Sequence, residues 1–393
     1  MTRRILLSFS GPDASGITQQ IFSAISHFDL EVIDIEQVVI HKRLSLGILI
    51  SSPESRDEIS LRDQLGEIAR NMGLEFTVQS DLGELHAPKN LVHVTLMGFP
   101  LRSDAVHRVS QEIWQSGSNI ESISRIADEP VTAIEFFISN AEVKEIRNLL
   151  SPISGECNVD IAVQPGGFVR HTKRLVLMDV DSTLIENEVI DMLAARAGHE
   201  GEVKKITEKA MNGEIDFRQS LNLRVKTLQG LTFEDIDYVR SQIRFTPGAL
   251  TLIRTLKAVG LLVGVVSGGF MEVIKPIAEE LELDFYRANR LEIENGVLTG
   301  RLIGNVIDKQ AKADALREFA DQHGVPLFQT VAIGDGANDV DMIEEAGLGI
   351  AFHAKNIVRD IADTSISLPN LDSVLFLLGI NRSEINEILD ENN

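Results

Sequence analysis

Cysteine is almost absent from this chain, because Cys157 is the only one among 393 residues. A single cysteine excludes an internal disulfide framework and is typical of a protein in a reducing compartment. No apolar stretch approaches the ~20 residues that a membrane-spanning helix needs, and the first residues lack the long apolar segment of a signal peptide. We therefore expect a cytoplasmic protein without a membrane partner, in which Cys157 is a small core residue.

Positive charge is also scarce, since 37 basic residues face 59 acidic ones and give a net charge of −22. This balance opposes binding to nucleic acid. The nine histidines are scattered, with no HExxH motif and no cysteine–histidine cluster, which disfavours a zinc site. The sequence GDGAND has aspartate where the third glycine of a dinucleotide-binding turn would stand, which argues against a nicotinamide-dependent dehydrogenase.

The length predicts two or three domains. Apolar periodicity predicts the element order βαββαβ twice, over residues 1–83 and again over 88–164, which favours two tandem ferredoxin-like α+β modules. The sequence QPGGF at residues 164–168 indicates a domain boundary.

Strands and helices alternate over residues 170–380, which predicts a doubly wound parallel sheet of the α/β class. A purely helical pattern at about residues 186–246 indicates a small cap inserted after the first strand of this sheet. Residues 381–393 are expected to form a loosely held acidic tail.

Acidic and hydroxyl side chains follow several apolar runs of this domain. Asp179 and Asp181 end the run that begins at Leu175, and two carboxylates so close together need a cation, a shared proton or separate roles. Alone, they could simply form a turn and a helix cap. Three more segments follow in order: Ser267 with Gly268, then Lys312 at the start of a helical pattern, then Asp335 and Asp339 in GDGANDVD. Open α/β sheets bind ligands at such strand ends.

The four segments together resemble the haloacid-dehalogenase-like phosphohydrolase superfamily. The resemblance implies Asp179 as nucleophile and Asp181 as general acid and base. It places Mg²⁺ on Asp179, Asp335 and the backbone carbonyl of Asp181. It further implies that Ser267, Gly268 and Lys312 contact the phosphate, with Asp339 as a supporting acid. The chemistry agrees, because a phosphomonoester needs charge neutralisation, an aligned nucleophile and a proton for its leaving alkoxide.

The stretch from Arg174 to Phe352 resembles the phosphoserine phosphatase family more closely, through DVDSTLIENE, KKITEKAMNGEIDFRQSLNLRV, VVSGGF, KAD and GDGAND. The resemblance implies hydrolysis of O-phospho-L-serine to L-serine and phosphate, the last step of L-serine biosynthesis. Its substrate residues correspond to Glu188 for the ammonium, Arg224 for the carboxylate, Met211 and Phe217 for closure, and Asn338 near the phosphate. A phosphatase or phosphotransferase that acts on phosphothreonine or phosphohomoserine stays open as an alternative, because one methylene changes affinity by only ~1–3 kcal/mol. A non-catalytic amino-acid sensor is the alternative of another class.

The sequence GPDASGI in the first module resembles the ACT family of amino-acid-sensing domains. Gly11, Asp13 and Gly16 would then form a ligand loop, whereas GFPLRSDAV in the second module lacks the last glycine. Two readings of these modules remain, namely L-serine sensing and simple dimerisation. Open sheets with edge strands favour a homodimer in either case.

Overall fold

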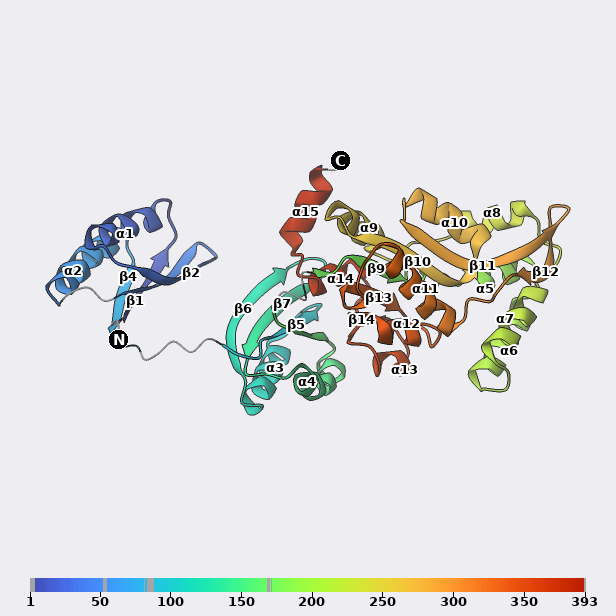
Figure 1. Ribbon diagram of the computed structural model, residues 1–393, viewed down its shortest axis with the longest axis horizontal. Coiled ribbons are helices and arrows are strands. Elements are labelled where there is room, and N and C mark those ends of the chain that lie inside the picture. The colour runs from blue at the N-terminus through green and yellow to red at the C-terminus, as the bar shows by residue number, and fades with distance from the viewer. Residues whose placement is uncertain are drawn as a thin grey trace. The chain divides into compact units, whose positions relative to one another are not determined.

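The structure is a computed structural model that describes residues 4–51, 55–80, 82, 88–167, 170 and 172–391, apart from the side chains of residues 55, 56, 211 and 391. The chain divides into two compact units, Met1–Ala87 and Pro88–Asn393. Each unit is coloured along the sequence in Figure 1. None of the helices in these ranges is both long and apolar enough to cross a bilayer.

The first unit is an α+β module with one antiparallel sheet in the order β2-β3-β1-β4. Ile5, Leu7 and Phe9 alternate with less buried residues along β1, so one face of the sheet packs against the helices. This is the predicted ferredoxin-like order. The elements are β1 (Arg4–Pro12), α1 (Ile17–Ile25), η1 (Ser26–Phe28), β2 (Val32–Ile40), β3 (Arg43–Ser51), α2 (Ser55–Asn71) and β4 (Glu75–Ser80).

The second module repeats this order but is not a separate unit. Its sheet joins the sheet of the following domain, because β8 pairs antiparallel with β15 (Thr364–Ile366) at Ala162 and Thr364. The predicted boundary at residues 164–168 is therefore a boundary in the sequence only. The elements of the module are β5 (Val92–Gly98), α3 (Ser103–Gln115), β6 (Asn119–Ala127), β7 (Thr132–Ser139), α4 (Val143–Cys157) and β8 (Asp160–Pro165).

The third domain has the predicted parallel sheet, with β9 (Leu175–Met178) between β10 (Leu262–Phe270) and β13 (Thr330–Gly334). The apolar residues of β9 belong alternately to two core clusters, since Val176 and Met178 pack on one side of the sheet and Leu175 and Leu177 on the other. Helices on both faces explain why the strand reads as a continuous apolar run.

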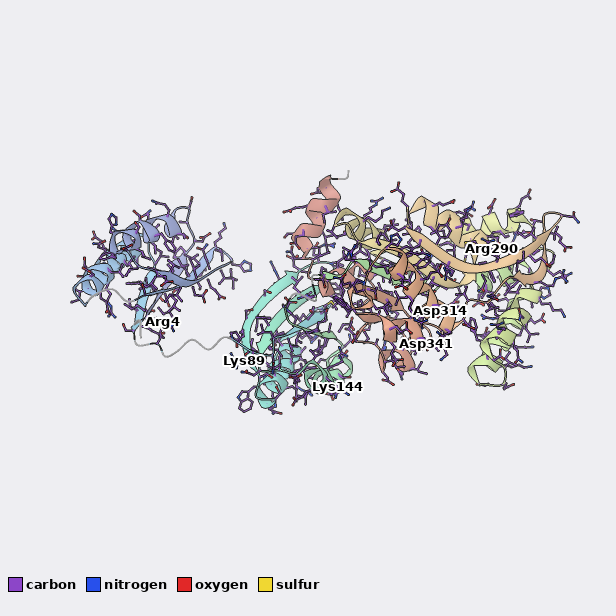
Figure 2. The ribbon with its side chains drawn as sticks, in the orientation of Figure 1. Arg4, Lys89, Lys144, Arg290, Asp314 and Asp341 are labelled. Carbon is purple, nitrogen blue, oxygen red and sulfur yellow. The ribbon has the colours of Figure 1, made fainter. Side chains whose placement is uncertain are left out.

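The other elements of the sheet domain flank these strands. Lys309 on α11 (Lys309–Gln322) lies 3.3 Å from Asp341 on α12 (Val340–Glu345), and Asp341 is labelled in Figure 2. The elements are α9 (Ala249–Ala258), α10 (Met271–Glu280), β11 (Phe285–Glu294), β12 (Val297–Ile303), α11 (Lys309–Gln322), η3 (Leu327–Gln329), α12 (Val340–Glu345), β14 (Gly349–Phe352), α13 (Asn356–Arg359), η4 (Leu371–Ser373) and α14 (Val374–Leu377).

The cap consists of α5 (Val189–Arg196), α6 (Glu200–Met211), α7 (Phe217–Lys226) and α8 (Phe233–Ser241), close to the four predicted helical segments. Asp216 and Thr232 begin α7 and α8 with complete capping boxes, in which the cap side chain and the third helical residue satisfy each other's backbone amides. These local signals fix where the two helices start.

The prediction of a loosely held acidic tail is wrong. Residues Arg382–Glu391 form helix α15, and Ile385 is fully buried in the main core cluster. Arg382 also pairs with the buried Asp372. The acidic residues misled the sequence interpretation because they occupy the outer face of an amphipathic helix. The sequence interpretation also missed the hairpin of β11 and β12.

Candidate active site

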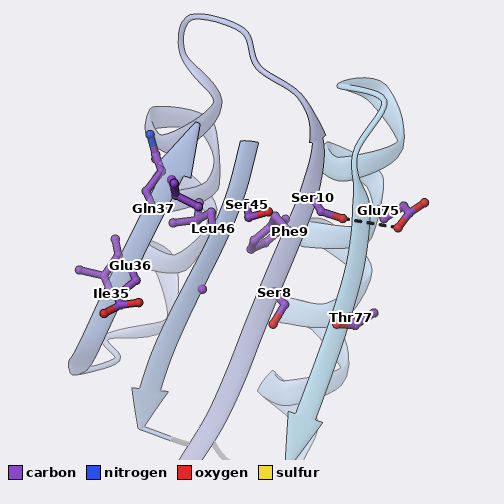
Figure 3. Close-up of a pocket in the computed structure, with 12 residues that line it drawn as sticks. Ser8, Phe9, Ser10, Ile35, Glu36, Gln37, Ser45, Leu46, Glu75 and Thr77 are labelled. Atoms are coloured by element: carbon purple, nitrogen blue, oxygen red, sulfur yellow. Dashed lines mark hydrogen bonds between the residues drawn. The ribbon is translucent and has the colours of Figure 1, made fainter. Parts of the chain in front are cut away.

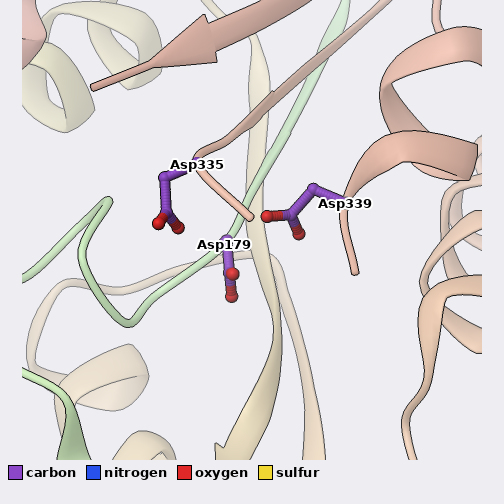
Figure 4. Close-up of side chains that lie close together, drawn as sticks. All are labelled: Asp179, Asp335 and Asp339. Carbon is purple, nitrogen blue, oxygen red and sulfur yellow. The ribbon is translucent and has the colours of Figure 1, made fainter. Parts of the chain in front are cut away.

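The carboxyl ends of β9, β10 and β13 meet at one edge of the sheet. Asp179 follows β9, Asp335 follows β13, and Ser267 lies near the end of β10. The register places Met178 beside Val265 on one neighbour and Ile333 on the other, so the residues that follow lie together. Figure 4 shows that the side chains of Asp179, Asp335 and Asp339 lie close together.

Lys312 is the cation beneath this acidic cluster. Its side chain is fully buried, and its Nζ lies 2.7 Å from Asp179 and 2.6 Å from Asp339. Burial by itself would lower the pKa of Lys312, but the two carboxylates outweigh it and raise that pKa above its usual range. Asp339 also accepts a hydrogen bond from the Gly336 amide at 3.0 Å. A Cβ on Gly334 would lie 2.4 Å from the Asp339 carboxyl carbon, so glycine is needed there.

The carboxylates of this cluster carry more negative charge than Lys312 balances. Burial and then the neighbouring Asp339 carboxylate raise the pKa of Asp179 well above its usual range, although Lys312 counteracts them. The same two causes raise the pKa of Asp335 to about 6. A site in which ionised carboxylates are disfavoured gains from a bound cation.

This group fits a hard divalent cation. Asp179, Asp335 and Asp339 can each offer one carboxylate oxygen, and these oxygens lie within 4.8 Å of one another. Carboxylate oxygens are the ligands that Mg²⁺ prefers. The set differs from the predicted ligands Asp179, Asp181 and Asp335, because it holds the carboxylate of Asp339 and not that of Asp181. The backbone carbonyl of Asp181 remains a predicted ligand.

Asp181 is held in a different way. Its Oδ1 accepts a hydrogen bond from the Val189 amide at 2.8 Å, and its Oδ2 accepts one from the Ser267 hydroxyl at 3.1 Å. Burial raises the pKa of Asp181. A carboxyl group with a raised pKa suits proton transfer, which is the predicted role of this residue.

A cavity of about 610 Å³ joins the acidic cluster to the cap. Glu188 and Arg224 line the cap side, and Asp179, Asp181 and Asp335 line the sheet side. Burial, followed by repulsion from Asp181, raises the pKa of Glu188 to about 7. Burial lowers the pKa of Arg224, and its Nε is buried without a hydrogen-bond partner among the described residues. The cap side thus presents the acid of Glu188 and the planar cation of Arg224 opposite the carboxylates of the sheet side.

Other predicted residues take different places around this cavity. Phe217, Gly268 and Asn338 line it. Ser267 and Lys312 are fully buried beneath the carboxylates that they contact, so their contact with a phosphate stays a prediction. Met211 ends α6, but its side chain lies outside the described residues.

The sequence interpretation missed two charged residues that line the cavity, Lys355 and Asp191. Asp191 sits three residues after Glu188, one turn along the cap helix α5, so a helical wheel could have placed it on the same side. Lys355 lies beyond β14, outside the four segments, and no signal in the sequence identified it.

The predicted ligand loop of the first module has structural reasons for its glycines. Gly16 precedes α1 at a φ of +90°, and a Cβ on Gly11 would lie 2.7 Å from Leu74. The module also has a cavity of about 720 Å³ on its sheet, lined among others by Ser8, Ser10 and Thr77 (Figure 3). Gly11, Asp13 and Gly16 are not among its lining residues.

Family models define the class of the chain. Residues 176–344 match the haloacid dehalogenase-like hydrolase model, and residues 3–79 and 92–164 each match an ACT domain model. The predicted fold class is therefore confirmed: two ACT domains precede a haloacid dehalogenase-like hydrolase domain.

Curated relatives are more specific. The chain is 48% identical to a phosphoserine phosphatase of Streptomyces coelicolor over 97% of this chain and 93% of the relative. It is 46% identical to one of Mycobacterium tuberculosis over 97% and 94%. A solved structure described as a phospho-aspartyl intermediate analogue of phosphoserine phosphatase matches 52% of this chain and 98% of its own, with 46% identity and a TM-score of 0.50. The chain belongs to the phosphoserine phosphatase family.

Proposed function

We propose that this chain hydrolyses O-phospho-L-serine to L-serine and phosphate, the last step of L-serine biosynthesis. One observation carries the proposal: a single cavity holds Asp179 and Asp181 on the sheet side and Glu188 and Arg224 on the cap side. Phosphoserine carries a phosphate, an ammonium and a carboxylate. The acid of Glu188 suits the ammonium, and the planar guanidinium of Arg224 suits the carboxylate in a way that lysine could not reproduce.

The reaction proceeds in two steps. The Asp179 carboxylate attacks phosphorus, the bond from phosphorus to the serine oxygen breaks, and Asp181 gives its proton to that oxygen. Water then attacks phosphorus, Asp181 takes the proton of the water, and phosphate leaves as the Asp179 carboxylate is restored. The related structure described as a phospho-aspartyl intermediate analogue supports an aspartyl-phosphate between the two steps.

Asp179, Asp335 and Asp339 would hold a Mg²⁺ ion, with the Asp181 carbonyl as the further ligand implied by the family. When bound, the ion supplies positive charge that offsets repulsion between the phosphate and the carboxylates. Lys312 supports the same balance from below, because it fixes Asp179 and Asp339 in place.

The ACT domains suggest regulation by an amino acid, and L-serine as the product is our choice of ligand. We also propose a homodimer, because β2 and β6 are edge strands whose residues are mostly exposed. The proposal of a homodimer does not depend on the catalytic assignment, whereas the choice of L-serine does.

Phosphate release tests the catalytic proposal. Phosphoserine, phosphothreonine and phosphohomoserine are compared, each with Mg²⁺ and with EDTA, and the Asp179→Asn variant is the control. We expect fast, metal-dependent release from phosphoserine that is lost in the variant. Equal rates on all three substrates would contradict selectivity for phosphoserine, and they would leave the roles of Glu188 and Arg224 unaffected, because all three substrates carry the same ammonium and carboxylate. No release from any of them would instead favour a non-catalytic sensor.

A further inference from the structure

A buried carboxylate of the second ACT domain reaches into the hydrolase domain. Asp160 begins β8 and is 1% exposed. Its Oδ1 accepts a hydrogen bond from the Ser367 hydroxyl at 2.6 Å, and its Oδ2 accepts from the backbone amides of Ser367 at 2.8 Å and Leu368 at 3.0 Å. One side chain of the ACT domain thus fixes the segment that follows β15.

The same segment holds the loop after β14. The Leu368 carbonyl accepts a hydrogen bond from His353 Nε2 at 2.9 Å, and Nε2 must carry the proton because a carbonyl can only accept. The backbone amide of His353 donates to the Ile366 carbonyl at 2.8 Å. His353 has a φ of +47°, a left-handed conformation that a residue other than glycine adopts only when its surroundings enforce it. These two hydrogen bonds hold His353 in this conformation.

The loop ends in the active site. Lys355 follows His353 by two residues, its amide donates to the Asp335 carbonyl at 3.2 Å, and it lines the cavity beside Gly336 and Asn338. A lysine in this place is a compact cation on the side where the phosphate would lie.

We propose that Asp160 is a positioning residue that sets Lys355 against the substrate phosphate, through Leu368 and His353. The second ACT domain then helps to set the geometry of the active site. The inference rests on the proposed function, which makes this cavity the phosphate site.

A second link between the two domains provides a matched control. Arg147 on α4 lies 3.0 Å from Asp363, which accepts a hydrogen bond from the Gly349 amide at 2.9 Å. Gly349 is the first residue of β14, at the end of the strand away from His353. Arg147 therefore joins the same domains without reaching the loop of Lys355.

The test measures steady-state kinetics of the full chain on phosphoserine. Asp160→Asn keeps the size of the side chain but removes the charge and one acceptor. We expect KM to rise about threefold to tenfold while kcat stays within about twofold. Lys355→Met should raise KM at least as much, and adding Asp160→Asn to it should raise KM no further. Arg147→Ala should leave KM unchanged.

Non-additivity separates positioning from a general loss of stability. Multiplied effects of Asp160→Asn and Lys355→Met would overturn the proposal, as would an equal rise of KM in Arg147→Ala. If Asp160→Asn fails to fold, His353→Ala replaces it, with the same expected rise and the same comparison with Lys355→Met. If the unmodified chain turns over normally and KM is unchanged in these variants, only this inference is overturned. If the unmodified chain shows no turnover, the proposed function itself is overturned.

Discussion

Lys312 illustrates how the active site holds charge that water cannot reach. An ammonium without solvent exposure is unfavourable unless carboxylates compensate for it, and Asp179 and Asp339 do so at 2.7 and 2.6 Å. Three acids and one buried lysine still leave negative charge in excess, and the raised pKa values of Asp179 and Asp335 express it. The residues are therefore arranged for a further cation and for a nucleophile that ionises when that cation is present.

Glu188 leads to a prediction about pH. Its pKa of about 7 means that the free enzyme holds it protonated below that pH, when it cannot pair with an ammonium. The kcat/KM for phosphoserine should therefore rise as the pH increases through about 7 and then level off. The pH profile of kcat/KM between pH 5 and 9 measures this.

Glu188→Gln provides the control, because it keeps the titration of the substrate phosphate and of the other carboxyl groups of the site and loses only that of Glu188. We expect a lower kcat/KM at pH 8 and the loss of the rise near pH 7. A variant profile that still rises near pH 7 would show that another group causes the dependence.

At the level of helices and strands, local signals in the sequence predict where helices of the cap begin, whereas tertiary packing determines the remaining elements. The capping boxes at Asp216 and Thr232 are readable in the sequence. The helix at residues 382–391 cannot be read from the sequence in this way. Its acidic residues are typical of a solvated tail, and only the folded core, into which Ile385 packs, stabilises the helix. The contacts between α15 and α9 occur only in the folded chain.

Ile385 tests whether α15 stabilises the hydrolase domain. Ile385→Ala removes a fully buried side chain from the main core, and such truncations cost about 2–5 kcal/mol. We expect Ile385→Ala to have a lower urea midpoint of unfolding than the unmodified chain, with unfolding monitored by circular dichroism. Asn386→Ala, at an exposed position on the same helix, should change stability by no more than about 0.5 kcal/mol. Equal midpoints for the two variants would show that the helix is loosely held after all.

At the scale of the whole molecule, the two ACT domains differ in their relation to the hydrolase domain. The first belongs to a separate compact unit that ends at Ala87, and the second shares an 11-stranded sheet with the hydrolase domain. A truncation at residue 164 would therefore cut through that sheet. Removing residues 1–87 leaves it intact.

The proposed regulation can be measured with that shorter truncation. If L-serine acts through the first ACT domain, residues 88–393 should keep their activity and lose most of the inhibition seen in the full chain. Competition by the product at Arg224 would give a different result, since it raises KM equally in both proteins. Initial rates at several concentrations of phosphoserine and L-serine distinguish the two, and unchanged inhibition after truncation would exclude sensing by the first domain.

The sequence alone predicted the domain types, the order of the catalytic segments and the identity of most of the charged residues that line the cavity. It could do so because parallel strands bring their carboxyl ends to one edge, so that Asp179 and Asp335 must meet once the strands are recognised. Only the tertiary structure decided that β8 pairs with β15, that α15 belongs to the core and that Lys355 reaches the site. The pairing of β8 with β15 depends on contacts between residues 207 positions apart, as between Asp160 and Ser367. The other two features depend on packing that forms only in the folded chain, and no local pattern encodes any of the three.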